Sequence, residues 1–271
     1  MTTTHEDRST ATDDDLLYDV GADGIAVATL NRPQARNALT FAMYERLAEI
    51  CRAIEPGGPV KVLIVTGAGA KAFAAGTDIS AFRDFHTREQ AVAYEAKMDG
   101  VLSSIEATPV PTIAAIAGAC TGGGAAIAAC CDIRLATRDM RFGFPIARTL
   151  GNCLSMSNLA RLAALIGPAR TREILFTARL IAADEALATG LVSELLDDHP
   201  ALMTRTMALA RQLTEHAPLT LRATKEAMRR LQSQELAGRD EDLIALCYTS
   251  ADFREGMDAF LAKRPPAWKG R

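Results

Sequence analysis

The feature that most constrains this chain is an apolar run that leads into three consecutive glycines. Residues 112–117 are Thr-Ile-Ala-Ala-Ile-Ala, residues 122–124 are all glycine, and small residues continue to Cys131. An uninterrupted apolar run indicates a strand that is covered on both faces. Glycines let the backbone approach a ligand closely, and the first N–H groups of a helix have no partner inside it. The pattern predicts a strand, a tight turn and a helix start whose amides can stabilise a negative oxygen, although a turn without chemistry stays open.

Composition fits one large domain with a full core and excludes several classes of partner. The chain has 271 residues, is 49% hydrophobic and carries a net charge of −3. This mild charge gives no indication of nucleic acid or an anionic membrane as a partner. No apolar run approaches the ~20 residues of a membrane span. The four histidines are scattered and no Cys-x-x-Cys is present, so we predict no metal site.

The first residues are polar and acidic. Residues 1–14 contain no apolar core, so we expect a disordered tail and neither a signal peptide nor a transit peptide. The six cysteines lie mostly inside apolar segments. Without a secretory signal, these features are typical of a cytoplasmic protein with reduced thiols.

The next part of the chain predicts an α/β fold. Residues 16–20 and 25–30 form apolar runs on either side of an Asp-Gly turn, which indicates a β-hairpin. Residues 41–54 show helical spacing after Thr40, a plausible N-cap, and residues 62–65 are a further buried strand. Strand, helix and strand in this order favour parallel strands with crossover connections.

A second informative stretch follows that strand. Residues 67–79 are small and weakly charged, and they leave the carboxyl end of a buried strand, where ligands bind in open α/β sheets. The stretch matches neither the dinucleotide-binding pattern nor a P-loop. After about residue 198 the pattern is entirely helical. We therefore predict a mixed core over 15–198 and a helical region over 199–271.

Several motifs together resemble the crotonase (enoyl-CoA hydratase/isomerase) superfamily, in register from about residue 16 to 271. They are Asn-Arg-Pro at 31–33, Arg-Asn-Ala-Leu at 36–39, Lys-Ala-Phe-Ala-Ala-Gly-Thr-Asp-Ile at 71–79, the glycine triplet with Cys-Asp-Ile-Arg-Leu-Ala-Thr at 131–137, Phe-Gly-x-Pro at 142–145, and Glu-Gly-Met-x-Ala-Phe-Leu-x-Lys-Arg at 255–264. The resemblance implies a spiral of stacked ββα units and a helical C-terminal trimerisation region. It also implies a homotrimer or homohexamer that acts on an acyl-CoA, with no cofactor beyond the CoA moiety of the substrate.

The resemblance also implies roles for individual residues. The backbone N–H groups of Thr77 and Gly123 would form an oxyanion hole for the thioester oxygen. The CoA moiety would be bound by residues of three segments, namely Arg36, Ala38, Ala74, Ala75, Gly76, Asp78, Phe260 and Lys263. For Arg36 and Lys263 an ordinary solvated side chain is the alternative.

The sequence departs from the family where hydratases carry two catalytic glutamates. These positions hold Ala126 and Ile146, and neither side chain can transfer a proton. A positioned acid or base is typically worth 10²–10⁴-fold in rate. The loop over 146–151 is about one residue longer than usual, and it offers no carboxylate in any register. Hydration itself is therefore doubtful, although the resemblance keeps the oxyanion hole intact.

Three hypotheses stay open. In the first, the enzyme has another acid/base set, with Cys153 as a candidate nucleophile, Arg148 favouring its thiolate, and Asp78 or His86 as further candidates. A buried inert cysteine, a loop acid and a surface histidine are the respective alternatives. In the second, the oxyanion hole acts together with a group of the substrate, as in isomerisation or decarboxylation, or in a thioesterase-type reaction. In the third, the protein binds acyl-CoA without catalysis.

Overall fold

The computed structural model describes residues 15–79, 86–232, 245 and 248–267. The predicted tail, residues 1–14, lies outside them. A large six-stranded sheet forms the centre of the molecule, in the strand order β1-β2-β3-β5-β7-β10. Its strands are β1 (Leu16–Val20), β2 (Ile25–Leu30), β3 (Val62–Gly67), β5 (Thr112–Ile116), β7 (Ile133–Thr137) and β10 (Glu194–Leu196). The hairpin β1–β2 is antiparallel, as predicted, and every other pairing in this sheet is parallel.

A smaller sheet lies beside the large one, and the residue ranges of its strands were not predicted. Its order is β4-β6-β8-β9, with β4 (Ala72–Ala74), β6 (Ala119–Thr121), β8 (Arg141–Gly143) and β9 (Ile181–Ala182). Three strands of the large sheet, β3, β5 and β7, are each followed by a short strand of this sheet and then by a helix. The three units are β3-β4-α2 (Arg88–Ala107), β5-β6-α3 (Gly123–Cys130) and β7-β8-α4 (Ile146–Thr149). The predicted spiral of ββα units is confirmed.

Local sequence explains where the main helices begin. In α1 (Phe41–Ala53) the Thr40 side chain accepts a hydrogen bond from the Met43 N–H, so the predicted N-cap is present. In α2 a capping box joins Thr87 and Gln90. The remaining helices are α5 (Met156–Ile166), α6 (Pro168–Thr177), α7 (Ala183–Ala188), α8 (His199–Thr214), α9 (Pro218–Gln232) and α11 (Ala251–Leu261).

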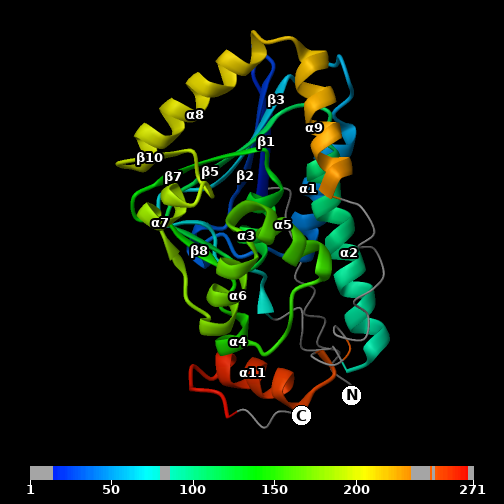
Figure 1. The fold of residues 1–271 in the computed structure, drawn as a ribbon, viewed down its shortest axis with the longest axis vertical. Helices are drawn as coiled ribbons and strands as arrows, with labels where there is room; N and C mark the ends of the chain where they lie inside the picture. Colours follow the sequence, from blue (N-terminus) through cyan, green and yellow to red (C-terminus); the bar gives the residue numbers. More distant parts are fainter. Residues whose placement is uncertain (1–14, 80–85, 233–244, 246–247, 268–271) are drawn as a thin grey trace, which may run out of the picture.

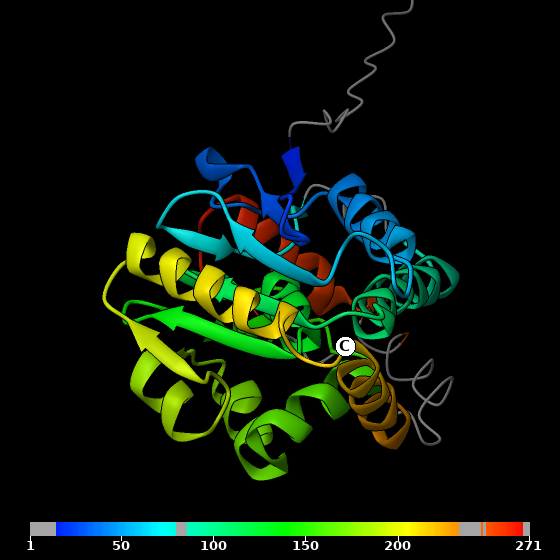
Figure 2. The same cartoon turned by 90° about the horizontal axis from the view of Figure 1, so that it is seen from above.

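The helical C-terminal region contributes to the core. Helix α8 packs on one face of the large sheet, where Leu202 and Ala210 join Ile25, Ile64 and Leu135 in an apolar cluster. Figure 2 shows α8 lying along the sheet, whereas Figure 1 shows α9 beside α1 and α2 and places α11 at the opposite end of the molecule. No helix in the described part of the chain is long and apolar enough to span a membrane.

One local prediction was wrong. Residues 146–151 were expected to form a loop, but α4 begins after Pro145 and makes one turn. On the other side of the small sheet, Ile181 pairs with Phe142 and α7 begins at Ala183.

Candidate active site

The two glycine-rich turns meet at one edge of the small sheet. Strands β4 and β6 are parallel neighbours, with Ala74 opposite Cys120. Because parallel strands bring their carboxyl ends to the same edge, the residues after Ala74 and after Thr121 emerge side by side. Strand β8 pairs parallel with β6 and brings residues 144–146 to the same edge.

The backbone around Thr77 keeps the N–H of that residue out of the local hydrogen bonds. Leu39 forms a parallel bridge to Thr77, in which the Leu39 N–H donates to the Gly76 carbonyl at 2.8 Å. The Asp78 N–H donates to the Leu39 carbonyl, also at 2.8 Å. The bridge therefore uses the Gly76 carbonyl and the Asp78 N–H, which belong to the two neighbours of Thr77, and not the Thr77 N–H itself. No acceptor for the Thr77 N–H is found among the residues that the structure describes.

Gly123 is the first residue of α3, so its N–H has no partner inside the helix. The preceding Gly122 has φ 52° and ψ −120°, a conformation that only glycine adopts readily, and its N–H donates to the Gly143 carbonyl at 3.0 Å. A Cβ on Gly123 would lie 1.7 Å from the Tyr44 hydroxyl and 2.9 Å from Thr77 Oγ1. Gly123 and Thr77 are therefore direct neighbours, and position 123 has no room for a side chain.

Both turns line one cavity of about 740 Å³. Ala126 and Ile146, at the two positions of the hydratase glutamates, line it as well. Seven of the other residues singled out from the sequence also do so, namely Arg36, Ala38, Ala75, Gly76, Asp78, Cys153 and Phe260. The cavity is of a size and composition that suits a small-molecule ligand.

Four of the residues singled out from the sequence do not line this cavity. Ala74 is completely buried in β4. Arg148 is an exposed residue of α4, and Lys263 is exposed after the end of α11. The structure therefore brings neither cation to the oxyanion edge. His86 is also exposed and away from the cavity lining.

The loop over 36–38 is fixed by a buried asparagine that the sequence analysis did not single out. Asn37 has φ 55° and is fully buried. Its amide group donates to the carbonyls of Ala72 at 2.7 Å and Ala68 at 3.1 Å, and its Oδ1 accepts from the Arg32 N–H at 3.0 Å. Asparagine tolerates a positive φ better than most residues. These bonds hold Arg36 at the rim of the cavity.

Polar side chains that were not predicted also line the cavity, namely Tyr44, Glu95, Asn152 and Tyr248. The Tyr44 hydroxyl lies 2.9 Å from Thr77 Oγ1. Burial raises the pKa of Tyr44 well above its ordinary value, the bond to Thr77 lowers it, and the charge of Glu95 raises it further. Tyr44 therefore stays a neutral phenol. Tyr44 lies among the buried residues of α1, beside Met43 and Leu47, so its position in the sequence gives no signal of a role in the site.

Cys153 lies in an apolar environment. It packs against a cluster of Ala91, Tyr248, Phe253 and Met257, and it is not part of a disulfide. No group of three or more potential metal ligands occurs in the residues for which coordinates are described.

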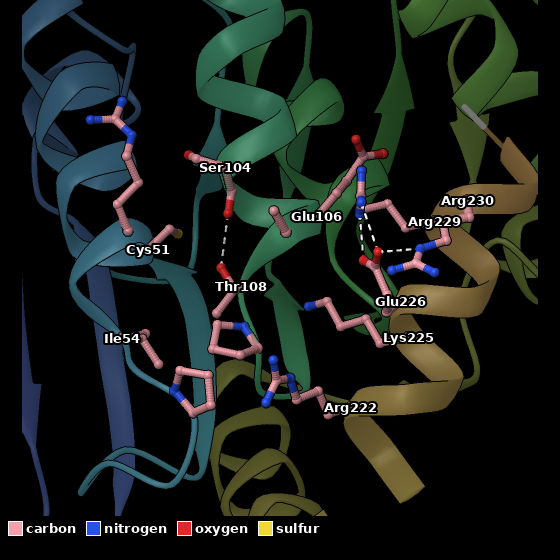
Figure 3. A pocket seen from close by; sticks show the side chains of 14 residues that line it. Cys51, Ile54, Ser104, Glu106, Thr108, Arg222, Lys225, Glu226, Arg229 and Arg230 are labelled. Carbon is pink, nitrogen blue, oxygen red and sulfur yellow. Dashed lines mark hydrogen bonds and ion pairs between the residues drawn. The ribbon is translucent and has the colours of Figure 1, made fainter. Parts of the chain in front are cut away.

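A second cavity, of about 510 Å³, lies between the ends of α1 and α2 and the side of α9 (Figure 3). Arginine and lysine side chains line it, and three of them, Lys225, Arg229 and Arg230, are held in ion pairs. Glu226 pairs with Arg229 at 2.7 Å and also with Arg230, and Lys225 pairs with Asp132 at 2.8 Å. None of the residues predicted for the site lines this cavity.

The fold and the site define an α/β protein with a spiral of ββα units and two backbone amides at one cavity. A family model for enoyl-CoA hydratase/isomerase matches residues 21–271. The chain belongs to the enoyl-CoA hydratase/isomerase family, the crotonase superfamily.

Individual relatives cover nearly the whole chain. It is 33% identical over 248 residues to a short-chain-enoyl-CoA hydratase of Clostridium acetobutylicum, covering 89% of this chain and 92% of that protein. It is 32% identical over 252 residues to a 2,3-dehydroadipyl-CoA hydratase of Escherichia coli, covering 91% of this chain and 96% of that protein. A crystal structure of an enoyl-CoA hydratase/carnithine racemase from Magnetospirillum magneticum matches with a TM-score of 0.77 and 37% identity over 96% of this chain and 97% of that one.

Proposed function

We propose that this protein catalyses an enolate-type reaction of an acyl-CoA thioester, with the N–H groups of Thr77 and Gly123 holding the thioester oxygen. The observation that carries this proposal is the juxtaposition of the two residues at one cavity, with Tyr44 between them. Charge develops on the thioester oxygen in the transition state, and fixed amides stabilise it without reorganisation. A donor of this kind contributes about 3–4 kcal/mol.

The adjoining segments support CoA as the carrier of the acyl group. The loop over 36–38 and the turn over 75–78 are joined by the Ala75 N–H, which donates to the Arg36 carbonyl at 3.0 Å. Arg36 is exposed at the rim, where a phosphate group of CoA could pair with its guanidinium. Phe260, 48% exposed, presents an apolar ring at the same cavity.

Two positions in the cavity lining support the inference that hydration by the usual pair of glutamates is not the principal reaction. A hydratase must place a water molecule and move protons to and from it, which requires positioned acid or base groups. Ala126 and Ile146 supply none. Isomerisation, decarboxylation or thioester cleavage needs no pair of groups at those two positions. A non-catalytic acyl-CoA-binding protein is the alternative from another class.

Turnover and binding assays test this proposal. Purified protein is incubated with crotonyl-CoA, with 3-enoyl, malonyl-type and saturated acyl-CoA esters, and product formation is followed by mass spectrometry while calorimetry measures binding. We expect tight binding of the esters, slow or no hydration of crotonyl-CoA, and turnover of another ester. Rapid hydration would contradict the inference drawn from Ala126 and Ile146. Binding without any turnover would favour the non-catalytic alternative.

We also infer that the protein is a homotrimer or homohexamer. Helix α9 has no buried residue, and its apolar side chains Leu219, Met228 and Leu231 are 75%, 53% and 68% exposed. Met228 and Leu231, three residues apart, lie next to each other on the helix surface, and such exposed apolar side chains are typical of a surface that another subunit covers. Light scattering coupled to size-exclusion chromatography tests this inference, and a monomeric mass would contradict it.

A further inference from the structure

We propose that Glu95 is the proton-transfer group of this site and that Tyr248 and Asn152 are its positioning residues, so that the enzyme moves a proton between two carbons of the acyl chain. This inference rests on the proposed function, since it requires a thioester at the Thr77 and Gly123 amides. The natural substrate class is a 3-enoyl thioester, which becomes the conjugated 2-enoyl thioester.

The first observation is the position of the carboxylate. Glu95 lies in the middle of α2, is only 6% exposed and lines the same cavity as Thr77 and Gly123. A carboxylate is rarely buried unless it is paired or has a functional role. The Tyr44 hydroxyl, which is hydrogen-bonded to Thr77, belongs to the same lining. Glu95 therefore shares its cavity with both oxyanion residues.

The second observation is a directed chain of hydrogen bonds. The Asn152 amide group donates to the Tyr248 hydroxyl at 3.1 Å, and that hydroxyl donates in turn to the Glu95 carboxylate in a short hydrogen bond. Burial and the nearby Glu95 charge raise the pKa of Tyr248, so the phenol remains a donor. A carboxylate that accepts a bond from a neutral donor is stabilised in its ionised form and kept in one orientation.

The third observation concerns the other end of Asn152. Its Oδ1 is buried and has no hydrogen-bond partner among the described residues. An unsatisfied acceptor inside a protein is costly and is retained where the side chain has another task, which here is the bond to Tyr248. Asn152 lines the same cavity as Glu95. The lining of one cavity thus combines a buried carboxylate and its hydrogen-bond partners with the two residues whose amides are the oxyanion donors.

These groups suffice for a reaction with one base. The Glu95 carboxylate takes a proton from C2 of the 3-enoyl thioester, and the C2–H electron pair forms a dienolate whose oxygen is held by the Thr77 and Gly123 amides. The carboxylic acid then returns the proton to C4, the double bond shifts to C2–C3, and the thioester carbonyl is restored. The reaction consumes no water and needs no second acid, because the same carboxyl group removes and returns the proton. It is therefore compatible with a site in which Ala126 and Ile146 replace the usual carboxylates.

The test uses 3-hexenoyl-CoA with the full-length protein. Isomerisation is followed by the absorbance of the conjugated product, and exchange of the C2 protons in D2O is followed by NMR. We expect Glu95→Gln to lower both rates by roughly 10²–10⁴-fold, because the amide cannot take the proton, while calorimetry shows unchanged binding of the thioester. Glutamine can still accept the Tyr248 bond, so the fold is preserved. Glu89→Gln, which changes an exposed carboxylate of the same helix, should keep the wild-type rates.

Tyr248→Phe separates positioning from a purely structural role. Burial and, in addition, the Glu95 charge raise the pKa of three tyrosines, which are Tyr44 of α1, Tyr94 of α2 and Tyr248 of the segment before α11. Loss of the Tyr248 donor raises the pKa of the Glu95 carboxyl, so the acidic limb of the kcat/KM profile should move to higher pH. An unmoved limb would overturn the role of Tyr248.

The possible failures can be told apart. If the wild type binds the thioester but neither isomerises it nor exchanges its protons, or if Glu95→Gln retains both rates, the role of Glu95 is overturned while the oxyanion hole stands. If the thioester does not bind at all, the proposed function fails together with this inference.

Discussion

The Tyr44 hydroxyl lies 2.9 Å from Thr77 Oγ1, and it occupies the space that a side chain at position 123 would need. One buried phenol thus packs against both residues whose amides we assign to the oxyanion hole. Since α1 supplies Tyr44, β4 leads to Thr77 and α3 begins at Gly123, this contact joins three separate elements of the fold.

We predict that Gly123→Ala strongly reduces turnover. The new Cβ would lie 1.7 Å from the Tyr44 hydroxyl, so the start of α3 and its amide must shift. Loss of one oxyanion donor costs about 10²–10³-fold in kcat. Steady-state kinetics on the best substrate of the panel measures the effect. The double variant with Tyr44→Phe should recover part of the loss, because the nearest remaining ring atom is 3.0 Å from that Cβ. Equal kcat in Gly123→Ala and wild type would contradict the assignment.

We predict that Asn37→Ala lowers both stability and affinity for acyl-CoA. The variant removes three hydrogen bonds from a fully buried residue with φ 55° and leaves two carbonyls and one N–H without their partner. The expected loss in the free energy of unfolding is about 2 kcal/mol. Urea titration and calorimetry measure the two effects. Gln34→Ala, an exposed neighbour, is the control and should change neither.

We predict that Arg36→Ala weakens binding of acyl-CoA more than binding of the matching acyl-pantetheine, which lacks the nucleotide phosphates. An exposed charge pair contributes roughly 1 kcal/mol or less and is screened by salt. The difference between the two ligands should therefore shrink as the ionic strength rises. Lys263 does not line the cavity of its own subunit. Lys263→Ala, measured in the same titrations, therefore tests whether Lys263 contacts CoA that is bound to a neighbouring subunit. An Arg36→Ala effect of equal size on both ligands would rule out a phosphate contact.

The acid sensitivity of the fold should depend on Arg179. Its guanidinium donates to Glu173 at 2.7 Å and to Glu185 at 2.8 Å, and these bonds lower the pKa of both carboxyls from the ordinary value of 4.5. A lowered pKa in the folded state gives stability that is present above the unfolded pKa and is lost as the pH falls through the folded pKa.

Arg179→Gln should therefore have a smaller free energy of unfolding than the wild type at pH 7. This free energy should also fall less in the variant than in the wild type when the pH is lowered below 4.5. Urea unfolding over a pH series measures this, with Arg138→Gln, in an exposed pair with Asp197, as the control. Parallel pH curves for Arg179→Gln and wild type would contradict it.

Much of the fold could be predicted from sequence because its signals are local. The buried strands β3 and β5 are continuous apolar runs, and Thr40 caps α1 as its position suggested. The small sheet could not be predicted, because strands of three residues beside glycines show no periodicity. They are stabilised by pairing with strands distant in sequence, such as β4 with β6.

The residues of the site also divide into those that could be predicted from local sequence and those that could not. The turns around Thr77 and Gly123 carry family motifs, so both residues could be singled out. Glu95 carries none, since one acidic residue in a helix normally faces solvent. Its partner Tyr248 is 153 residues away in the sequence, so only the folded chain brings the two together.

The vibrational frequency of the bound thioester carbonyl tests the central claim most directly. A 13C-labelled acyl-CoA is bound to the protein, and infrared difference spectra against the unlabelled ester isolate the carbonyl band. If the amides of Thr77 and Gly123 hold the oxygen, the band moves to lower frequency than in water, and Gly123→Ala moves it back. A bound carbonyl with the same frequency as the free ester, and no response to Gly123→Ala, would contradict the oxyanion hole.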